Sequence, residues 1–371
     1  MNRFFSMAGI GLAAALMAGL ALIPGSGVQT IEYEFHDSHH HLTNYIQEGP
    51  DLEEMLDLMG DKVGRIALFG IPLQQTWSYR NSGDNAPSYY LQSDSPLYYY
   101  SFTDAYIASL YNSLTPEQQA RFDPMITGFN PADMYGVDHI RRVLETFPGV
   151  FSGIGEFTIH KEFVSGKIAG EVASLDDPAL DRILAFAAET GLLVLVHCDV
   201  DIPFQKPGVE PRYLTQMKRA VARHPDATVI WAHMGLGRVV HPNVRSEDAI
   251  ELGARSTIPL MLLEEGLADP NFKNLYHDIS WDEVAKWVVA DPETTQAVAD
   301  IINKYPDRIL FGSDAVAPAN EGVFLKTYKM YAPLWKLLTP EALEMVLKKN
   351  HERLFDAAAE KVRAWERENL K

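Results

Sequence analysis

The chain has 371 residues, of which 47% are hydrophobic and 22% charged, and this composition excludes disordered and fibrous proteins. Its formal net charge of -18 would be repelled by phosphate backbones and anionic lipid surfaces, so we expect no nucleic-acid partner. The single cysteine, Cys198, excludes an intrachain disulfide.

The N-terminal segment resembles a secretory signal. A basic residue, Arg3, precedes an uncharged and mostly apolar run over 4–23, and small residues follow at Gly25 and Gly27. We therefore expect residues 1–27 to be a signal peptide, cleaved after Gly27, and the mature protein to be periplasmic or secreted. The apolar run is also long enough to span a bilayer, so a retained N-terminal membrane anchor is the alternative.

From Ile31 onward, short apolar runs that end in polar residues alternate with longer segments of helical period. This pattern is typical of repeated strand–helix units around a parallel sheet. Thr115-Pro116, Asp177-Pro178 and Thr339-Pro340 each place a capping side chain before a proline, which marks a helix start. We predict an α/β fold of the (β/α)8 TIM-barrel class for residues 28–371, with helices at the C-terminal end. The predicted strands are 31–39, 65–70, 124–128, 151–156, 192–197, 228–233, 275–280 and 308–314.

A long insertion over 74–121 follows the second predicted strand. It holds eight of the sixteen tyrosines, including Tyr89-Tyr90 and Tyr98-Tyr99-Tyr100. Loops that follow strands lie at the catalytic face of a barrel, so the insertion could form a lid over a substrate pocket. The alternative is an aromatic packing layer or a subunit contact in a homo-oligomer.

Several predicted strands end in a side chain that can bind a metal ion. In a barrel the strand ends converge on one face, so residues far apart in sequence can surround one ion. His39 and His41 are two residues apart in an extended chain and therefore point to the same side. Each of these residues alone could be a core, helix-capping or ion-paired side chain. Together they supply the imidazole and carboxylate ligands of a metal ion, so the whole set predicts a metal site. The six candidate ligands are His39, His41, Glu156, His197, His233 and Asp314.

In this order, the motifs resemble the amidohydrolase superfamily, most closely its amidohydrolase-related (amidohydrolase 2 type) metal-dependent hydrolases and decarboxylases. The resemblance starts at Asp37-Ser38-His39-His40-His41-Leu42, similar to the family's D-x-H-x-H-L motif. It continues through Gly155-Glu156, His197, His233-Met234-Gly235 and Gly312-Ser313-Asp314, and ends at Asn350-His351-Glu352-Arg353-Leu354-Phe355.

The resemblance implies that His39, His41 and Asp314 bind one divalent ion, expected to be Zn with Mn or Fe as alternatives. Glu156 would bridge to a second ion at His197 and His233, and a metal-activated water would attack an ester, lactone or amide carbonyl of a small molecule. Asp314 would then carry the proton to the leaving group. In the family's one-metal variant, His197 joins the first ion and His233 acts as the acid or base.

Two other functions remain open from the sequence. A metal-dependent nonoxidative decarboxylase of an aromatic or unsaturated acid would need a cationic anchor for the substrate carboxylate. Lys161, Lys206, Arg212 and Arg238 follow the fourth to sixth strands and could supply that anchor. The second alternative is a noncatalytic exported barrel that binds a ligand on Trp281 and the tyrosines. Because no glycine-rich phosphate loop or nucleotide motif stands out, we expect no organic cofactor.

Overall fold

Short, buried strands form the centre of the computed structural model, which describes residues 32–71, 79–85, 94–161, 173–202, 211–238 and 258–370. Every residue of Leu193–Cys198 is buried, as expected for a parallel strand that is covered on both faces. The barrel strands are β1 (Phe35–His41), β2 (Val63–Phe69), β3 (Phe122–Ile126), β4 (Gly153–His160), β5 (Leu193–Cys198), β6 (Val229–Trp231), β7 (Leu275–Ile279) and β8 (Ile309–Phe311).

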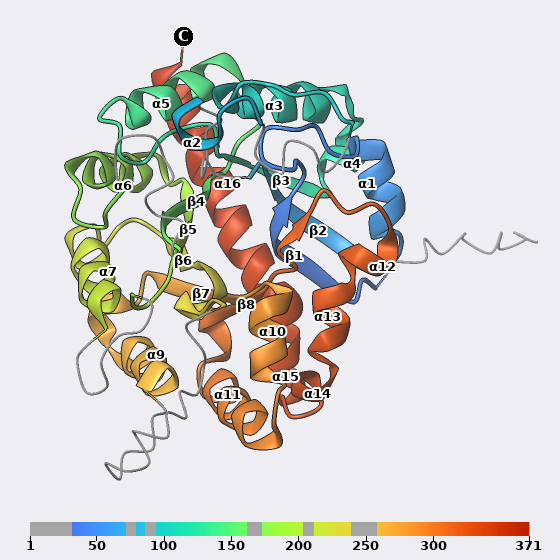
Figure 1. The fold of residues 1–371 in the computed structure, drawn as a ribbon, viewed down its shortest axis with the longest axis vertical. Helices are drawn as coiled ribbons and strands as arrows, with labels where there is room; N and C mark the ends of the chain where they lie inside the picture. The colour runs from blue at the N-terminus through green and yellow to red at the C-terminus, as the bar shows by residue number, and fades with distance from the viewer. Residues whose placement is uncertain are drawn as a thin grey trace, which may run out of the picture. The chain divides into compact units, whose positions relative to one another are not determined.

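The strands pair in parallel and in chain order, from β1 beside β2 to β7 beside β8. A ninth strand of two residues, β9 (Ala315–Val316), follows β8 and pairs with β1, where His41 lies opposite Val316. The chain therefore returns from the last barrel strand to the first one through β9. Figure 1 shows β1 to β8 at the centre, with helices around them. The (β/α)8 prediction is confirmed, with this short strand as an addition.

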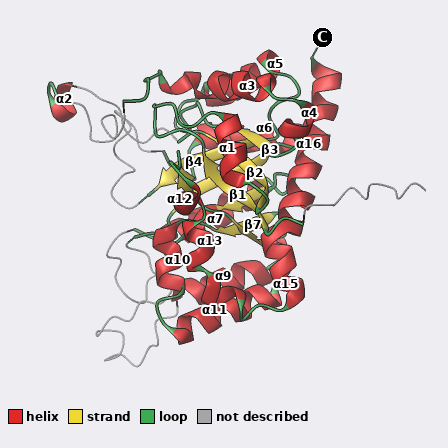
Figure 2. Cartoon of the chain, turned by 90° about the vertical axis from the view of Figure 1, so that its right-hand side faces the viewer, coloured by secondary structure: helices red, strands yellow, loops and turns green. Residues whose placement is uncertain are grey.

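The interior of the barrel is filled by apolar side chains from several strands. Phe69, Met125, Leu195 and Leu310 belong to one buried cluster with Phe355 of the C-terminal helix α16 (Asn350–Asn369). Figure 2 shows α16 running along one side of the strands. Since its Arg363 also donates to the carbonyl of Phe151, just before β4, α16 covers the amino-terminal ends of the strands. The opposite end is left for the site.

Helices pack around the outer face of the strands and bury the larger hydrophobic cluster. The three predicted helix starts are confirmed, because Thr115, Asp177 and Thr339 each cap a helix that begins with proline. The helices are α1 (Leu52–Met59), α2 (Tyr79–Ser82), α3 (Thr103–Ser113), α4 (Pro116–Gln119), α5 (Gly136–Thr146), α6 (Pro178–Thr190), α7 (Arg212–Arg223), α9 (Ile258–Ala268), α10 (Asp282–Val288), α11 (Pro292–Lys304), α12 (Glu321–Phe324), α13 (Lys326–Met330), α14 (Ala332–Trp335), α15 (Pro340–Glu344) and α16.

The first predicted strand is displaced. It was expected over 31–39, but β1 begins at Phe35 and continues to His41. The pairing explains the shift, because Phe35 lies opposite Val63, where β2 begins, and His41 lies opposite Phe69, where β2 ends. The alternation of apolar and acidic residues at Glu32, Tyr33 and Glu34 therefore lies before the first residue of β1 and is not part of the sheet.

Residues Tyr33–Lys371 form one compact unit. In the described part of the chain, no helix is both long and apolar enough to cross a membrane. The predicted signal segment, 1–27, lies outside the described residues, as do 74–78 and 86–93 of the tyrosine-rich insertion. Its described part contacts the loop after β1, where the hydroxyl of Tyr98 donates to the carbonyl of Tyr45, and it exposes Tyr79 and Tyr99.

Candidate metal centre

The structure brings all six predicted ligand residues to one place at the carboxyl end of the barrel. They come from β1, β4 and β5, from the turn η3 (Ala232–Gly235) that follows β6, and from the residue three positions after β8. Five of the six side chains are at most 2% exposed, and that of Asp314 is 10% exposed. The six residues therefore form one buried cluster.

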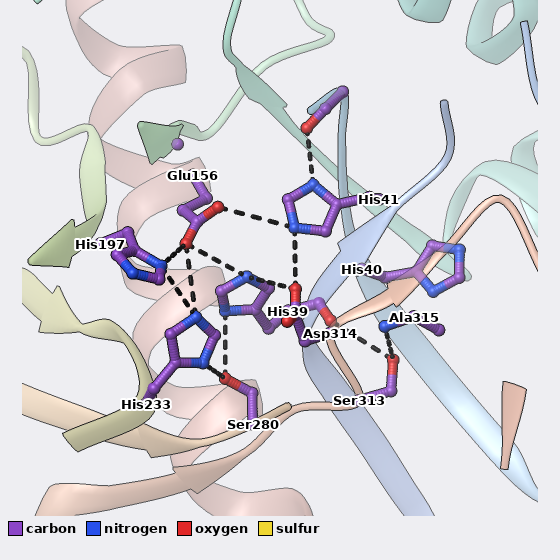
Figure 3. Close-up of polar contacts among 12 residues, drawn as sticks. His39, His40, His41, Glu156, His197, His233, Ser280, Ser313, Asp314 and Ala315 are labelled. Atoms are coloured by element: carbon purple, nitrogen blue, oxygen red, sulfur yellow. Dashed lines mark hydrogen bonds and ion pairs between the residues drawn. The ribbon is translucent and has the colours of Figure 1, made fainter. Parts of the chain in front are cut away.

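Glu156 lies at the centre of this cluster (Figure 3). Its Oε1 is 2.8 Å from Nδ1 of His197 and 3.5 Å from Nε2 of His233. The same oxygen is 3.7 Å from Nε2 of His39, and Oε2 is 3.6 Å from Nε2 of His41. One carboxylate therefore faces the histidines of both predicted ion sites.

Asp314 completes the part of the cluster built on β1. Its Oδ1 is 3.0 Å from Nε2 of His41 and 3.3 Å from Nε2 of His39. The backbone of Asp314 has a φ of 52°, a left-handed conformation that non-glycine residues seldom adopt and that is concentrated at functional sites. Its N–H donates to the carbonyl of His39 at 2.8 Å, which fixes the turn against β1.

Two overlapping sets have ligand atoms close enough to share an ion. One contains His39, His41 and Asp314, and the other contains His39, Glu156 and His233. His197 is in neither set, but its Nδ1 is 3.0 Å from Nε2 of His233 and 2.8 Å from Oε1 of Glu156. The structure thus brings together the first predicted set as expected and places His39 between both sets.

Three of the histidines are held from behind by acceptors outside the cluster. Nδ1 of His41 donates to the carbonyl of Gly70 at 2.8 Å, and Nδ1 of His39 donates to Oδ2 of Asp278 at 2.9 Å. Nδ1 of His233 lies 2.7 Å from Oγ of Ser280. Each Nε2 consequently points toward Glu156 or Asp314. Metal-binding histidines are oriented by outer partners of this kind.

The cluster fits a divalent metal ion on two grounds. Nε2 of His39 is buried and makes no hydrogen bond to any described residue, as expected of an atom reserved for a ligand. Imidazole and carboxylate together are the donors that Zn, Mn and Fe accept. The buried set of histidines and acids is therefore consistent with divalent metal binding, and it does not identify the metal.

The acids of the cluster are held ionised. Burial opposes ionisation of Glu156, but the neighbouring His197, His233 and His39 outweigh burial and hold its pKa well below its ordinary value. Burial is likewise outweighed at Asp314, where His39 and His41 hold the pKa well below the usual range. Burial would lower the pKa of His39, but the neighbouring Asp278 and Asp314 outweigh burial and raise that pKa well above 6.5.

Asp278 and Ser280 were not singled out in the sequence. Both lie at the end of β7 and point to the same side, because they are two residues apart. That spacing, the same as that of His39 and His41, was the signal that could have found them. Asp278 is fully buried and also accepts the N–H of His233 at 2.8 Å, so it positions histidines from both sets.

The four predicted cationic anchors are not equally placed. Lys161 and Arg238 both lie against the ring of Trp281, which itself contacts the imidazole of His233. Arg212 is the first residue of α7, and its backbone N–H donates a hydrogen bond to the side chain of Asp201. Lys206 lies outside the described residues. The structure therefore brings two of the four cations to the wall of the cluster.

Comparison with known proteins places these observations in context. Residues 37–357 match the family described as amidohydrolase, and no curated protein matches the chain at a significant level. Among solved structures, an uncharacterized TIM-barrel protein from Bordetella bronchiseptica is 15% identical, with a TM-score of 0.51 over 87% of this chain and 99% of that one. A 2,6-dihydroxybenzoate decarboxylase from Rhizobium is 13% identical, with a TM-score of 0.50 over 88% and 99%. A putative 2-pyrone-4,6-dicarboxylic acid hydrolase from Pseudomonas putida is 14% identical, with a TM-score of 0.49 over 88% and 98%. At these identities, the first two structural likenesses establish the fold alone.

Proposed function

This chain belongs to the amidohydrolase family of metal-dependent enzymes, and on that premise we propose that it hydrolyses an ester, lactone or amide bond of a small molecule. The observation that carries this proposal is the position of Glu156, whose carboxylate faces His197 and His233 through Oε1 and His41 through Oε2. A carboxylate that faces both sets suits two neighbouring ions, and a pair of ions is a common device for activating water in hydrolases.

In this proposal His39, His41 and Asp314 hold one ion, His197 and His233 hold the other, and Glu156 contacts both. Zn is the expected metal, with Mn or Fe as alternatives. When bound, the metal would lower the pKa of a water molecule and polarise the substrate carbonyl.

The chain's own residues would then manage the proton. Asp314 is ionised because neighbouring histidines outweigh its burial, so its carboxylate can accept a proton from the water and pass it to the leaving group. With a single ion, His233 would take this part, and its Nδ1 contact with Ser280 leaves Nε2 turned inward for the transfer. The burial of the cluster keeps bulk water away from these groups.

Nonoxidative decarboxylation is the second candidate, and one observation favours it. Lys161 and Arg238 lie near His233, where they could hold the carboxylate of an aromatic or unsaturated acid. A decarboxylase with this fold is known among the structural neighbours, although at 13% identity.

Metal content tests the proposal first. We would measure metal per chain by elemental analysis in protein produced with added metal, for the wild type, for His39→Asn/His41→Asn and for His139→Asn. His139 pairs with Asp104 outside the cluster and serves as the matched control. About two ions per chain, lost only in the double variant, would support a two-metal hydrolase. One ion would shift weight to the one-metal mechanism, and no metal in folded protein would refute the proposal.

Turnover then separates the two reactions. The metal-loaded protein would be assayed against a panel of lactones, esters and amides, and against aromatic acids with detection of carbon dioxide. Hydrolysis of a panel member supports the proposal, whereas carbon dioxide release without hydrolysis favours the decarboxylase.

Three predictions from the sequence stay predictions. Export with cleavage after Gly27 is tested by N-terminal sequencing of the mature protein from its host. The role of the tyrosine-rich insertion as a lid, or as a subunit contact in a homo-oligomer, is tested by light scattering and by deletion within it.

A further inference from the structure

The pairing of β4 with β5 is irregular around Glu156. Ile154 lies opposite Val194, and Phe157 lies opposite Val196. β4 therefore has one residue more than β5 over this stretch. An extra residue of this kind is a β-bulge, which redirects a side chain and is common beside active sites. Pairing with β5 thus does not by itself set the direction of the Glu156 side chain.

The pairing of β4 with its other neighbour, β3, stops just before the same point. Met125 lies opposite Gly153, and Ile126, the last residue of β3, lies opposite Ile154. Glu156 is two residues beyond this last pair. A contact outside the two strand pairings therefore has to hold the backbone of β4 where Glu156 begins.

The side chain of Thr127, the first residue after β3, supplies that contact. Its Oγ donates a hydrogen bond to the carbonyl oxygen of Gly155 at 2.8 Å. Thr127 is only 2% exposed, so bulk water does not compete for this hydrogen bond. The carbonyl belongs to the planar peptide group that joins Gly155 to Glu156. The hydroxyl of Thr127 therefore fixes the direction in which the chain enters Glu156.

Gly155 is also packed closely against β5. A Cβ at this position would lie 2.5 Å from the carbonyl oxygen of Leu195, and the φ of 137° is one that glycine alone adopts readily. The backbone before Glu156 is thus confined by Leu195 on β5 and by the hydroxyl of Thr127 after β3. Removal of the hydroxyl would release one of these two constraints.

Thr127 is itself held by the tyrosine-rich insertion. Its backbone N–H donates to Oδ1 of Asp104 at 2.8 Å, and Asp104 is the second residue of α3 and fully buried. Asparagine in place of Asp104 would keep an oxygen for this N–H, so the contact depends on the oxygen and not on the charge. Two hydrogen bonds therefore connect the insertion to the residue before Glu156.

We propose that Thr127 is a positioning residue of the metal centre, which directs the Glu156 carboxylate by holding the carbonyl of Gly155. Oε1 is 2.8 Å from Nδ1 of His197, and Oε2 is 3.6 Å from Nε2 of His41, so a rotation of the backbone would move the carboxylate relative to both histidines. This inference rests on the proposed function, because it requires Glu156 to contact the metal. It deepens that function by giving the insertion a part in metal binding.

A double-mutant cycle in metal affinity tests whether Thr127 acts through Glu156. The variants are Thr127→Val, Glu156→Gln and the double variant, since residues that act together have non-additive effects. Thr127→Ser keeps the hydroxyl. Thr295→Val is the matched control, because Thr295 is 4% exposed and its Oγ donates to the carbonyl of Val288 at 3.0 Å, in α11 and outside the cluster.

The affinity of each full chain for Zn²⁺ would be measured by competition with a chelator, together with ions per chain and urea unfolding. Outer partners of metal ligands typically change the affinity about 10- to 100-fold. We expect Thr127→Val to weaken Zn²⁺ binding by about tenfold, the lower end of that range, because a neutral hydrogen bond is lost. Thr127→Ser should retain the affinity. In the Glu156→Gln background, Thr127→Val should cause no further loss.

Both valine variants should lose stability, and only Thr127→Val should lose affinity for Zn²⁺. Unchanged affinity in Thr127→Val, or an equal loss in Thr127→Ser or Thr295→Val, would overturn the positioning role. A fully additive loss in the double variant would show that Thr127 does not act through Glu156. A wild type that is folded but binds no Zn²⁺ would instead refute the metal centre, and with it the proposed function and this inference.

Discussion

Replacing Asp278 with asparagine tests whether the histidines of the cluster are positioned in advance of the metal. Oδ2 of Asp278 accepts a hydrogen bond from His39 at 2.9 Å, and Oδ1 accepts the N–H of His233 at 2.8 Å. Asparagine keeps the shape but loses the charge. Loss of a hydrogen bond to a charged group costs about 1.5–3 kcal/mol. Because about 1.4 kcal/mol corresponds to a factor of ten, we expect the affinity for Zn²⁺ to fall about 10- to 100-fold.

The affinity would be measured by competition with a chelator of known strength, and the stability of the metal-free protein by urea unfolding. Asp104→Asn is the matched control. Asp104 is also fully buried, accepts the N–H of Thr127 at 2.8 Å and contacts His139 at 2.9 Å, but lies outside the cluster. Both variants should lose stability, and only Asp278→Asn should lose affinity for the metal. Unchanged affinity in Asp278→Asn, or an equal loss in Asp104→Asn, would refute the reasoning.

Three further results are expected. In Gly312→Ala the new Cβ would lie 2.5 Å from Cβ of His39, so we expect urea unfolding to show a loss of about 2 kcal/mol or more and metal binding to weaken. Gly266→Ala in α9, where an added Cβ meets nothing within 4 Å, should instead gain about 0.5–1 kcal/mol, and a loss there would contradict this account. Burial lowers the pKa of His277 to about 3 and, together with the nearby charge of Arg308, keeps it neutral in the folded state. Its contribution to stability is complete above pH 6.5 and is lost as the pH falls toward 3, by up to about 1.4 kcal/mol per pH unit. His277→Gln should flatten the fall of the urea midpoint below pH 6.5, and an unchanged slope would assign the acid sensitivity to other groups.

The barrel was predictable because its strands are buried on both faces and therefore appear as apolar runs. The same property made His197 predictable, since it interrupts such a run near the end of β5. Glu156 was expected at the end of its strand, but it lies inside β4, which continues to His160. The limits of β1 were not predictable from alternation, because its extent depends on where β2 begins and ends.

The supporting residues were harder to find, because their roles depend on partners from other strands. Asp278 resembles any acid at a strand end until the structure places it 2.9 Å from His39. The sequence offered four candidate cations, and the positions of their side chains depend on loop conformation, which has no periodic signal in sequence. The structure distinguishes Lys161 and Arg238 from the other two by their contact with the ring of Trp281.

The return of the chain to β1 has a consequence for how the barrel opens. The N–H of Ser313 donates to Asp37 at 2.7 Å, and the N–H of Ala317 donates to the carbonyl of His41 at 2.8 Å. An ion shared by His41 and Asp314 would lie beside these hydrogen bonds and connect two residues that are 273 positions apart in sequence. Removal of the metal by a chelator would then weaken the contact between β1 and the segment that follows β8. The amide hydrogens of Ser313 and Ala317 should therefore exchange faster in the metal-free protein than the amide hydrogens between β4 and β5.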